Sequence, residues 1–134
     1  MVGDKLGNAT GKVILRRVLS AGAGSARTEI TQRGTGTLLG VEYQEMTTYE
    51  SEFRPDGTLI GTGQGIYMGT GGEVATWTGQ GVGTLSKGGG ASFRGALYLY
   101  STSAKWQRLN AVASVFEYEV DANDNYKATL TEWK

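Results

Sequence analysis

The sequence predicts an all-β protein, an eight-stranded antiparallel up-and-down barrel with one short helical turn near residues 103–109. Three observations support this fold class: twenty-two glycines against a single proline, eight segments of β-type composition, and short turn sequences between them. The glycines favour a closed barrel, because small barrels need bend points at their corners. A two-sheet sandwich is the competing architecture.

The first half of the chain supplies three long β segments. Residues 11–20 are β-branched and apolar, and residues 26–39 alternate before they reach Gly34 and Gly36. Residues 41–54 follow and end at the sequence Arg54-Pro55-Asp56-Gly57. This is a strong turn signal, because proline presets φ and glycine accepts a positive φ. We expect a flexible N-terminus over residues 1–9 and a single β-barrel domain over residues 10–134.

The second half supplies five further segments. They are predicted at residues 58–68, 74–86, 91–101, 110–120 and 126–133. Between them lie two glycine-rich turns and a polar turn. The segment 103–109 begins with Ser103, a candidate helix N-cap, and shows no alternation, so it predicts a single helical turn.

The polar turn, residues 121–125, imitates the spacing of a calcium-binding loop with Glu132 as its last ligand. Tyr126 stands where that loop requires glycine, and strands rather than helices flank it. We therefore interpret this run as a polar hairpin turn and expect no metal site and no cofactor.

Glycine occupies alternate positions in the middle of the chain. The positions are Gly61, Gly63 and Gly65 in one predicted strand and Gly79, Gly81 and Gly83 in the next. Because side chains on a strand alternate between its faces, each strand has one bare face. Each such glycine costs roughly 0.5–1 kcal/mol relative to alanine. We expect barrel curvature, bulky side chains from elsewhere, or a ligand or second chain on the bare backbone to compensate.

The glycine strands also contain a repeat. Thr62-Gly63-Gln64-Gly65 recurs as Thr78-Gly79-Gln80-Gly81, and a turn near residue 71 or 72 folds one copy back on the other. We favour the register that places Gln64 opposite Gln80 and glycine opposite glycine. Four apolar residues then share a face: Ile66, Met68, Val74 and Val82. Curvature at a barrel corner is the plainest interpretation of the repeat. The functional interpretation is that the two glutamines and the bare backbone form the floor of a binding site.

The composition argues against several function classes. The chain has no cysteine and no histidine, so disulfides, thiolate chemistry, a Ser-His-Asp arrangement and nearly all catalytic zinc sites are excluded. Thirteen basic residues balance thirteen acidic ones, so we expect neither nucleic acid nor membrane as a partner. The absence of cysteine and of a signal-peptide pattern at the N-terminus suggests a cytoplasmic location.

Any catalysis would have to use carboxylates, tyrosines, arginines or lysines. In the segment 41–54, the odd-numbered positions place Glu45 on one face with Tyr43, Tyr49 and Phe53. If this face points inward, burial raises the pKa of Glu45 and makes it a proton shuttle or ligand anchor. The alternative is that Glu45 pairs with an arginine, Arg33 or Arg94, or lies at a rim. Glu45 is the catalytic candidate.

Aromatic residues are most simply interpreted as core filling opposite the glycines. We expect Phe116 and Tyr118 to point inward, and Glu117 and Glu119 to face solvent. A ligand cavity lined by part of the aromatic set is the alternative. For that case the ligand-binding candidates are Tyr43, Glu45, Tyr49, Gln64, Tyr67, Trp77, Gln80, Arg94 and Phe116.

Four segments carry a resemblance to known proteins: Arg54 to Leu59, Ala75 to Gly83, Phe93 to Ala96 and Phe116 to Val120. Over about residues 10–134 the chain resembles a group of small bacterial and archaeal proteins without assigned activity. Its architecture is also similar to allene oxide cyclase-type, calycin-like barrels. Such barrels often enclose an apolar cavity and associate, so the resemblance implies a homo-oligomer, a dimer or trimer. The resemblance identifies no catalytic residues in this chain, since fold does not determine function.

Three functions remain open. The first is binding of a small, largely apolar ligand in the barrel lumen. The second is a cofactor-independent cyclase or isomerase that uses a lumen carboxylate or tyrosine. The third is a structural protein that forms oligomers through the glycine patch. A lumen that is completely filled by side chains would contradict the first two.

Overall fold

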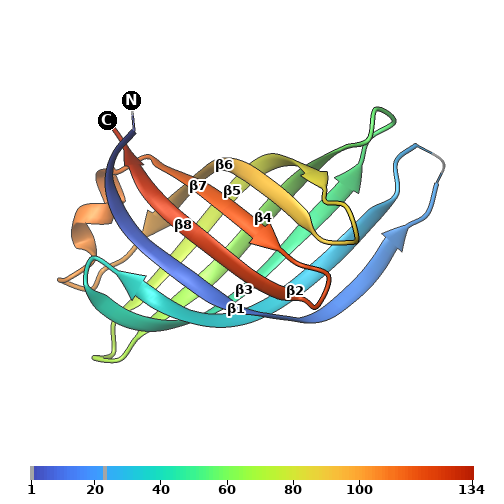
Figure 1. Cartoon of the computed structure of the whole chain (residues 1–134). Coiled ribbons are helices and arrows are strands. Elements are labelled where there is room, and N and C mark those ends of the chain that lie inside the picture. Colours follow the sequence, from blue (N-terminus) through green and yellow to red (C-terminus); the bar gives the residue numbers. More distant parts are fainter. Residues whose placement is uncertain (1, 23) are drawn as a thin grey trace.

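The computed structural model describes residues 2–22 and 24–134 and has the form of a closed antiparallel barrel (Figure 1). Each strand pairs with the next, and β1 closes the ring by pairing with β8. The strands are β1 (Val2–Ser20), β2 (Arg27–Leu38), β3 (Val41–Phe53), β4 (Thr58–Gly69), β5 (Val74–Leu85), β6 (Ala91–Tyr100), β7 (Ser114–Val120) and β8 (Asn125–Trp133). A 3-10 helix, η1 (Gln107–Ala111), lies between β6 and β7. The predicted fold class is confirmed.

The first strand differs most from the sequence prediction. Residues 2–9, expected as a flexible N-terminus, belong to β1, and Gly7, Asn8 and Ala9 pair with both β2 and β8. The expectation was wrong because this polar, glycine-containing segment has little β propensity of its own. Its structure comes from partners that are distant in sequence.

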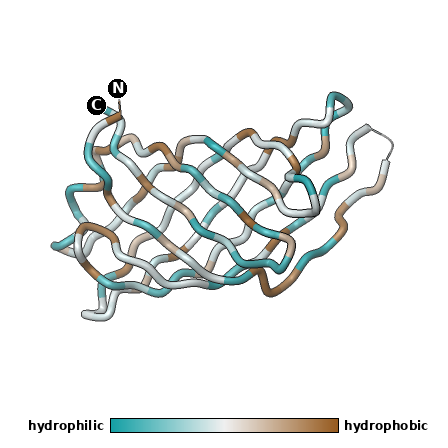
Figure 2. The backbone as a smooth tube through the Cα atoms, in the orientation of Figure 1, coloured by the Kyte–Doolittle hydropathy of each residue, from teal (hydrophilic) through white to brown (hydrophobic). Residues whose placement is uncertain are grey.

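Side chains that point into the barrel form a single hydrophobic core. Hydrophobic and hydrophilic residues intermix along the strands, as expected for walls with one buried and one exposed face (Figure 2). On β3 the odd-numbered positions face inward, and on β7 Tyr118 is buried while Glu117 and Glu119 are exposed, as predicted. Parity along the chain therefore identified the inner face correctly in these strands.

The β4–β5 hairpin has a register two residues away from the predicted one. Glycine does lie opposite glycine, Gly61 with Gly81 and Gly63 with Gly79, but Gln64 lies opposite Thr78 and not opposite Gln80. The reason is the turn after Met68. The buried carboxylate of Glu73 accepts a hydrogen bond from Gly71 N at 3.0 Å, and Gly69 N donates to Glu73 O at 2.8 Å. This places the turn over residues 69–73, centred on residue 71.

Aromatic rings occupy the space above the bare glycine faces. A Cβ atom on Gly63 would lie 3.2 Å from the indole of Trp77, and one on Gly81 would lie 2.9 Å from the ring of Phe116. A Cβ on Gly61 would lie 3.2 Å from the ring of Phe93. Bulky side chains packed on the bare backbone were one of the three ways in which we expected the cost of the glycines to be offset, and they are present. They leave little room for alanine at these positions.

The two ends of the barrel differ. At one end η1 and the preceding turn cover the lumen, where Trp106 and Leu109 are completely buried and Trp106 Nε1 donates to Leu38 O at 2.9 Å. Figure 1 shows this end beside both chain termini, opposite the long β1–β2 and β3–β4 hairpins. The predicted helical turn is thus present, shifted to Gln107–Ala111, and it acts as a plug.

Among the described residues, η1 is far too short to cross a bilayer, and no other helix qualifies as a candidate span. The same residues contain no cluster of three or more side chains that could hold a metal ion. The run 121–125 forms a hairpin turn in which Asp121 Oδ1 accepts hydrogen bonds from Asn123 N and Asn125 N at 2.8 and 3.0 Å. The interpretation as a polar turn is confirmed.

Candidate functional site in the barrel lumen

The middle of the lumen contains a cavity of about 90 Å³. Its wall is mainly aromatic, and the bare backbone of several glycines forms part of it. This volume holds several water molecules or a small apolar group. The residues that border it include Gln32, Leu38, Tyr43, Glu45, Thr47, Tyr49, Gly61, Gly63, Tyr67, Trp77, Gly79, Gly81, Phe93, Leu97, Phe116, Tyr118, Ala128 and Leu130.

Glu45 is the acidic residue of this wall. Only 5% of its surface is exposed, and Tyr126 from β8 donates a hydrogen bond of 2.8 Å to its Oε1 atom. Burial raises the pKa of Glu45 to about 7, while the hydrogen bond from Tyr126 acts in the opposite direction. Near neutral pH the carboxyl group can therefore both accept and release a proton. The alternative partners, Arg33 and Arg94, are exposed on the outside of the barrel.

Two stacked tyrosines lie next to Glu45. The rings of Tyr43 and Tyr67 have centroids 4.5 Å apart, and Tyr43 donates its hydroxyl hydrogen to Asn8 O at 3.0 Å. Burial, followed by the nearby charge of Glu45, raises the pKa of both tyrosines. Both hydroxyls therefore stay protonated, and the hydroxyl hydrogen of Tyr43 is held by Asn8 O.

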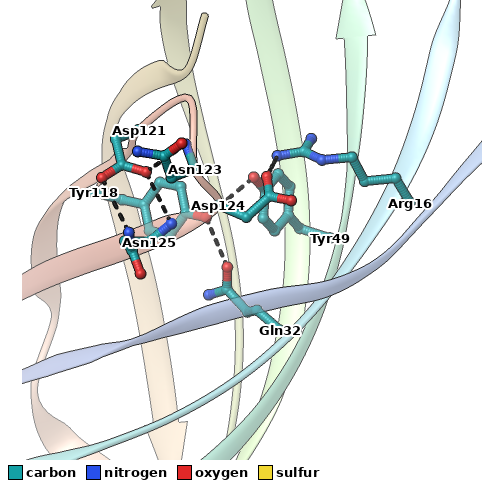
Figure 3. A network of polar contacts seen from close by, with 8 residues as sticks. All are labelled: Arg16, Gln32, Tyr49, Tyr118, Asp121, Asn123, Asp124 and Asn125. Atoms are coloured by element: carbon teal, nitrogen blue, oxygen red, sulfur yellow. Dashed lines mark hydrogen bonds and ion pairs between the residues drawn. The ribbon is translucent and has the colours of Figure 1, made fainter.

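A second polar group lies toward the open end of the barrel (Figure 3). Tyr118 donates to Gln32 Oε1 at 2.6 Å, so the 3.2 Å contact between the Tyr49 and Tyr118 hydroxyls has Tyr49 as its donor. Burial raises the pKa of Tyr49 and Tyr118. The result is a fixed chain of hydrogen bonds from β3 through β7 to β2.

Two polar atoms of the wall are unpartnered. Thr47 Oγ1 and Trp77 Nε1 are buried and have no hydrogen-bond partner among the described residues. Both atoms approach the bare face of Gly65, where an added Cβ would collide with Trp77 Nε1 and lie 2.8 Å from Thr47 Oγ1. An unpaired buried donor costs about 1–3 kcal/mol, and a polar ligand atom or an ordered water that reached this pair of atoms would recover that free energy. Neither atom is itself exposed to the cavity, so such a contact requires a shift of the wall.

The lumen opens at the hairpin end of the barrel. A hollow of about 340 Å³ lies there, and it shares Tyr49 and Phe93 with the inner cavity. Arg16 of β1 and Asp124 of the β7–β8 turn form an ion pair of 2.9 Å at this mouth (Figure 3). Because η1 covers the opposite end, the mouth is the open side of the lumen.

Seven of the nine predicted ligand-binding candidates border the cavity: Tyr43, Glu45, Tyr49, Tyr67, Trp77, Gln80 and Phe116. Gln64 and Arg94 do not border it and are exposed at outward positions. Gln80 also stands at an outward, exposed position, because glycines and glutamines alternate along these strands and the glycines face inward. The interpretation in which both glutamines form the floor of a binding site is therefore wrong for Gln64.

Sequence reasoning missed four polar residues of this site as candidates. Gln32, Thr47 and Tyr118 stand at inward parity positions, and that signal was available in the sequence. Tyr126 was considered only as a mismatch to a calcium loop. Its contact with Glu45 depends on barrel closure between β1 and β8, which no local pattern reveals.

No protein-family model matches the sequence, and no curated protein matches it. Solved structures do match in fold. A conserved protein of unknown function from Rhodopseudomonas palustris has a TM-score of 0.84 at 14% identity, with 98% of this chain and 97% of that chain covered. A protein of unknown function from Clostridium acetobutylicum has a TM-score of 0.85 at 14% identity and covers 98% of both chains.

A β-barrel-like protein from Acinetobacter baumannii has a TM-score of 0.83 at 12% identity, covering 100% of this chain and 96% of that chain. An enzyme from Penicillium herquei has a TM-score of 0.70 at 13% identity, covering 96% and 92%. At these identities the likeness concerns the fold. The chain is therefore similar in fold to small β-barrel proteins, two of which are described as proteins of unknown function.

Proposed function

We propose that the protein binds a small, largely apolar molecule in the barrel lumen. The observation that carries the proposal is the pair of unpartnered buried atoms, Thr47 Oγ1 and Trp77 Nε1, beside a cavity with an aromatic wall. Ligand pockets typically combine an apolar lining with a few polar groups that orient the ligand. In this arrangement Trp77 donates a hydrogen bond to the ligand and Thr47 accepts or donates one.

The size of the cavity restricts the ligand. A volume of about 90 Å³ is below the roughly 300–1,000 Å³ of typical small-molecule sites. It suits a compact apolar group, and a larger ligand would extend past Tyr49 and Phe93 into the hollow of about 340 Å³ at the mouth.

We also infer a cytoplasmic location, since a chain without cysteine suits a reducing compartment.

Native mass spectrometry of protein purified without denaturation tests the proposal. We expect a retained small molecule on the wild type and its loss in Ala128→Leu, which fills the cavity from β8. Lys127→Leu, its exposed neighbour on the same strand, should retain the molecule. Thr47→Val and Trp77→Phe should weaken retention, whereas Thr48→Val, an outward neighbour, should not. A wild type without any bound molecule, and equal behaviour of the Ala128 and Lys127 variants toward added apolar probes, would refute binding in the lumen.

A second candidate function is acid–base catalysis without a cofactor, as in an isomerase or cyclase. The specific observation is Glu45, whose carboxyl group borders the cavity and has a pKa of about 7. Efficient general acid–base catalysts have a pKa near the operating pH. One barrel of similar fold is described as an enzyme, which is compatible with catalysis on this architecture.

Deuterium exchange of a model carbon acid tests this candidate. With cyclohex-2-enone as the probe in D₂O, NMR should show faster exchange at C6, the saturated carbon next to the carbonyl, with the wild type than with Glu45→Gln. Glu50→Gln, on the outside of the same strand, is the matched control. Equal exchange rates for all three proteins would leave ligand binding as the sole lumen function.

A further inference from the structure

The outer face of the β4–β5 hairpin carries no charge. Residues 58–69 and 74–85 contain no acidic or basic side chain. Exposed apolar side chains lie on this face instead, among them Ile66 at 44%, Met68 at 38%, Val74 at 49% and Val82 at 52%. Ion pairs are found on other strands, such as Arg17–Glu29 and Lys127–Glu119. Depletion of charge together with exposed apolar and aromatic residues is typical of the core of a protein interface.

We propose that this face binds the same face of a second copy of the chain, with a two-fold axis that runs along the strands between β4 and β5. A two-fold interface must be complementary to itself. Rotation about this axis places the outward side chains of β3 over those of β6 of the second copy, and those of β4 over those of β5. The strand register therefore gives the pairs of positions that face each other in the two copies. These pairs are closest for β4 and β5 and farther apart for β3 and β6, because the wall of the closed barrel curves away from the axis.

The row at one end of this face has complementary charges. Across the register it runs Glu52, Ile60, Val82, Arg94. The rotation brings Glu52 of one copy over Arg94 of the other, twice per dimer, and Ile60 over Val82. Arg94 already pairs through Nε with Glu117 of its own chain in an exposed contact of 3.3 Å, so the contact with Glu52 of the second copy would use the terminal guanidinium nitrogens. An apolar centre flanked by two opposite-charge pairs is the arrangement that specifies orientation as well as affinity.

The sequence repeat supplies the middle of the face. Thr62 lies opposite Gln80 and Gln64 opposite Thr78, so two hydroxyls and two carboxamides stand at the corners of a rectangle. The rotation sets each threonine of one copy against a glutamine of the other, so donors meet acceptors in both directions. This gives the two glutamines, whose side chains are exposed on the outer face, a role in recognition.

Large outward side chains of one copy also lie over smaller side chains of the other. A groove of about 440 Å³ crosses the face, lined by Thr48, Gln64, Thr78 and Tyr98 among others. The rotation lays the large Tyr98 over the small Thr48, and Tyr100 over Met46 in the next row. The register provides five outward positions on each of β3 and β6 and six on each of β4 and β5. Their number is comparable to the roughly 20–30 residues a side of a stable interface.

Sedimentation equilibrium tests this proposal independently of any lumen ligand. The wild type should sediment at twice its 14.2 kDa mass. Thr78→Lys, at the centre of the face, should raise the dissociation constant about tenfold or more, because it places two like charges beside the axis. Thr10→Lys, exposed on the remote strand β1, should leave the dissociation constant unchanged. Circular dichroism confirms that each variant is folded.

A charge reversal identifies the axis. Glu52→Arg and Arg94→Glu should each raise the dissociation constant, and the double variant should restore it to within about threefold of the wild type. A wild type that is monomeric at 100 μM, a trimer, or single reversals without effect would overturn the proposal. Rescue by the double reversal excludes misfolding as the cause of the single effects.

Discussion

Tyr126 and Glu45 meet inside the barrel through a hydrogen bond of 2.8 Å, although they are 81 positions apart in the chain. The donor comes from β8 and the acceptor from β3, so the contact spans the lumen rather than joining neighbouring strands. It connects the acidic group of the cavity to the wall facing it. The properties of Glu45 should therefore depend on Tyr126 as well as on burial.

Replacement of Tyr126 by phenylalanine should raise the pKa of Glu45 further above 7. The hydrogen bond from Tyr126 stabilises the ionised carboxylate and so lowers the pKa, and its loss leaves burial unopposed. Carboxyl ¹³C NMR titration of Glu45 measures this directly. Tyr98→Phe, on the outer face, serves as the control and should not change the titration. A pKa that falls in Tyr126→Phe would contradict the assigned role of the bond.

The stability of the protein should contain a term that decreases as the pH rises through 7. The pKa of Glu45 is raised from its ordinary 4.5 to about 7 in the folded protein, so the folded state binds the proton more tightly than the unfolded chain. This contribution is fully present below pH 4.5. Between there and pH 7 it decreases, by about 3 kcal/mol in all.

Urea unfolding at pH 5 and pH 8 checks this, with Glu45→Gln as the comparison. Glutamine keeps an oxygen for Tyr126 but cannot ionise. The variant should therefore gain stability relative to the wild type between pH 5 and pH 8. Glu50→Gln, on the outside of β3, should follow the wild type at both values. Parallel pH dependence of wild type and Glu45→Gln would mean that Glu45 has an ordinary pKa.

Alanine at position 65 should destabilise the barrel by about 1–3 kcal/mol. An added Cβ collides with Trp77 Nε1 and crowds Thr47 Oγ1, and both lie in a packed wall. Denaturant unfolding measures the loss. Gly22→Ala, where the nearest atom is an ordinary 3.6 Å away, should have little effect. If crowding is the cause, Trp77→Leu in the same chain should recover part of the loss.

Truncation of the plug should cost more than any exposed substitution. Trp106→Ala removes a fully buried ring and should lower the free energy of unfolding by about 3–5 kcal/mol. Trp106→Phe keeps most of the ring but leaves Leu38 O without its donor, at a cost of about 1–3 kcal/mol. Trp133→Phe, at a side chain that is 57% exposed, should stay within about 0.5 kcal/mol. Equal stability of all three variants would show that η1 does not secure this end.

The sequence was sufficient for the features that depend on local alternation. The strand pattern and the inward direction of Glu45, Tyr43 and Tyr118 follow from parity, which any half-buried strand must obey. The hairpin register did not follow. It is set by the carboxylate of Glu73, which binds its own turn, and a shift of two residues preserves parity while it changes every partner.

Long-range contacts account for most of what the sequence left undetermined. The N-terminal part of β1 has little strand character of its own and is held by two partners. The Tyr126–Glu45 contact arises only when the ring closes. The volume of the cavity is the enclosed volume of the barrel minus the volume of the side chains that fill it. The amino-acid composition does not predict this small difference.

Closure of the ring also restricts how the molecule can associate. Over residues 7–12, β1 pairs with both β2 and β8, so this part of the wall has no free edge with unpaired backbone groups. Beyond Lys12, β1 pairs with β2 alone, and the stretch up to Ser20 keeps one open edge. Growth by strand addition, the usual route from exposed edges to fibrils, therefore has a starting point at the β1–β2 hairpin. Contacts between copies on the closed wall must be made by side chains, so single surface substitutions there should be enough to create or abolish them.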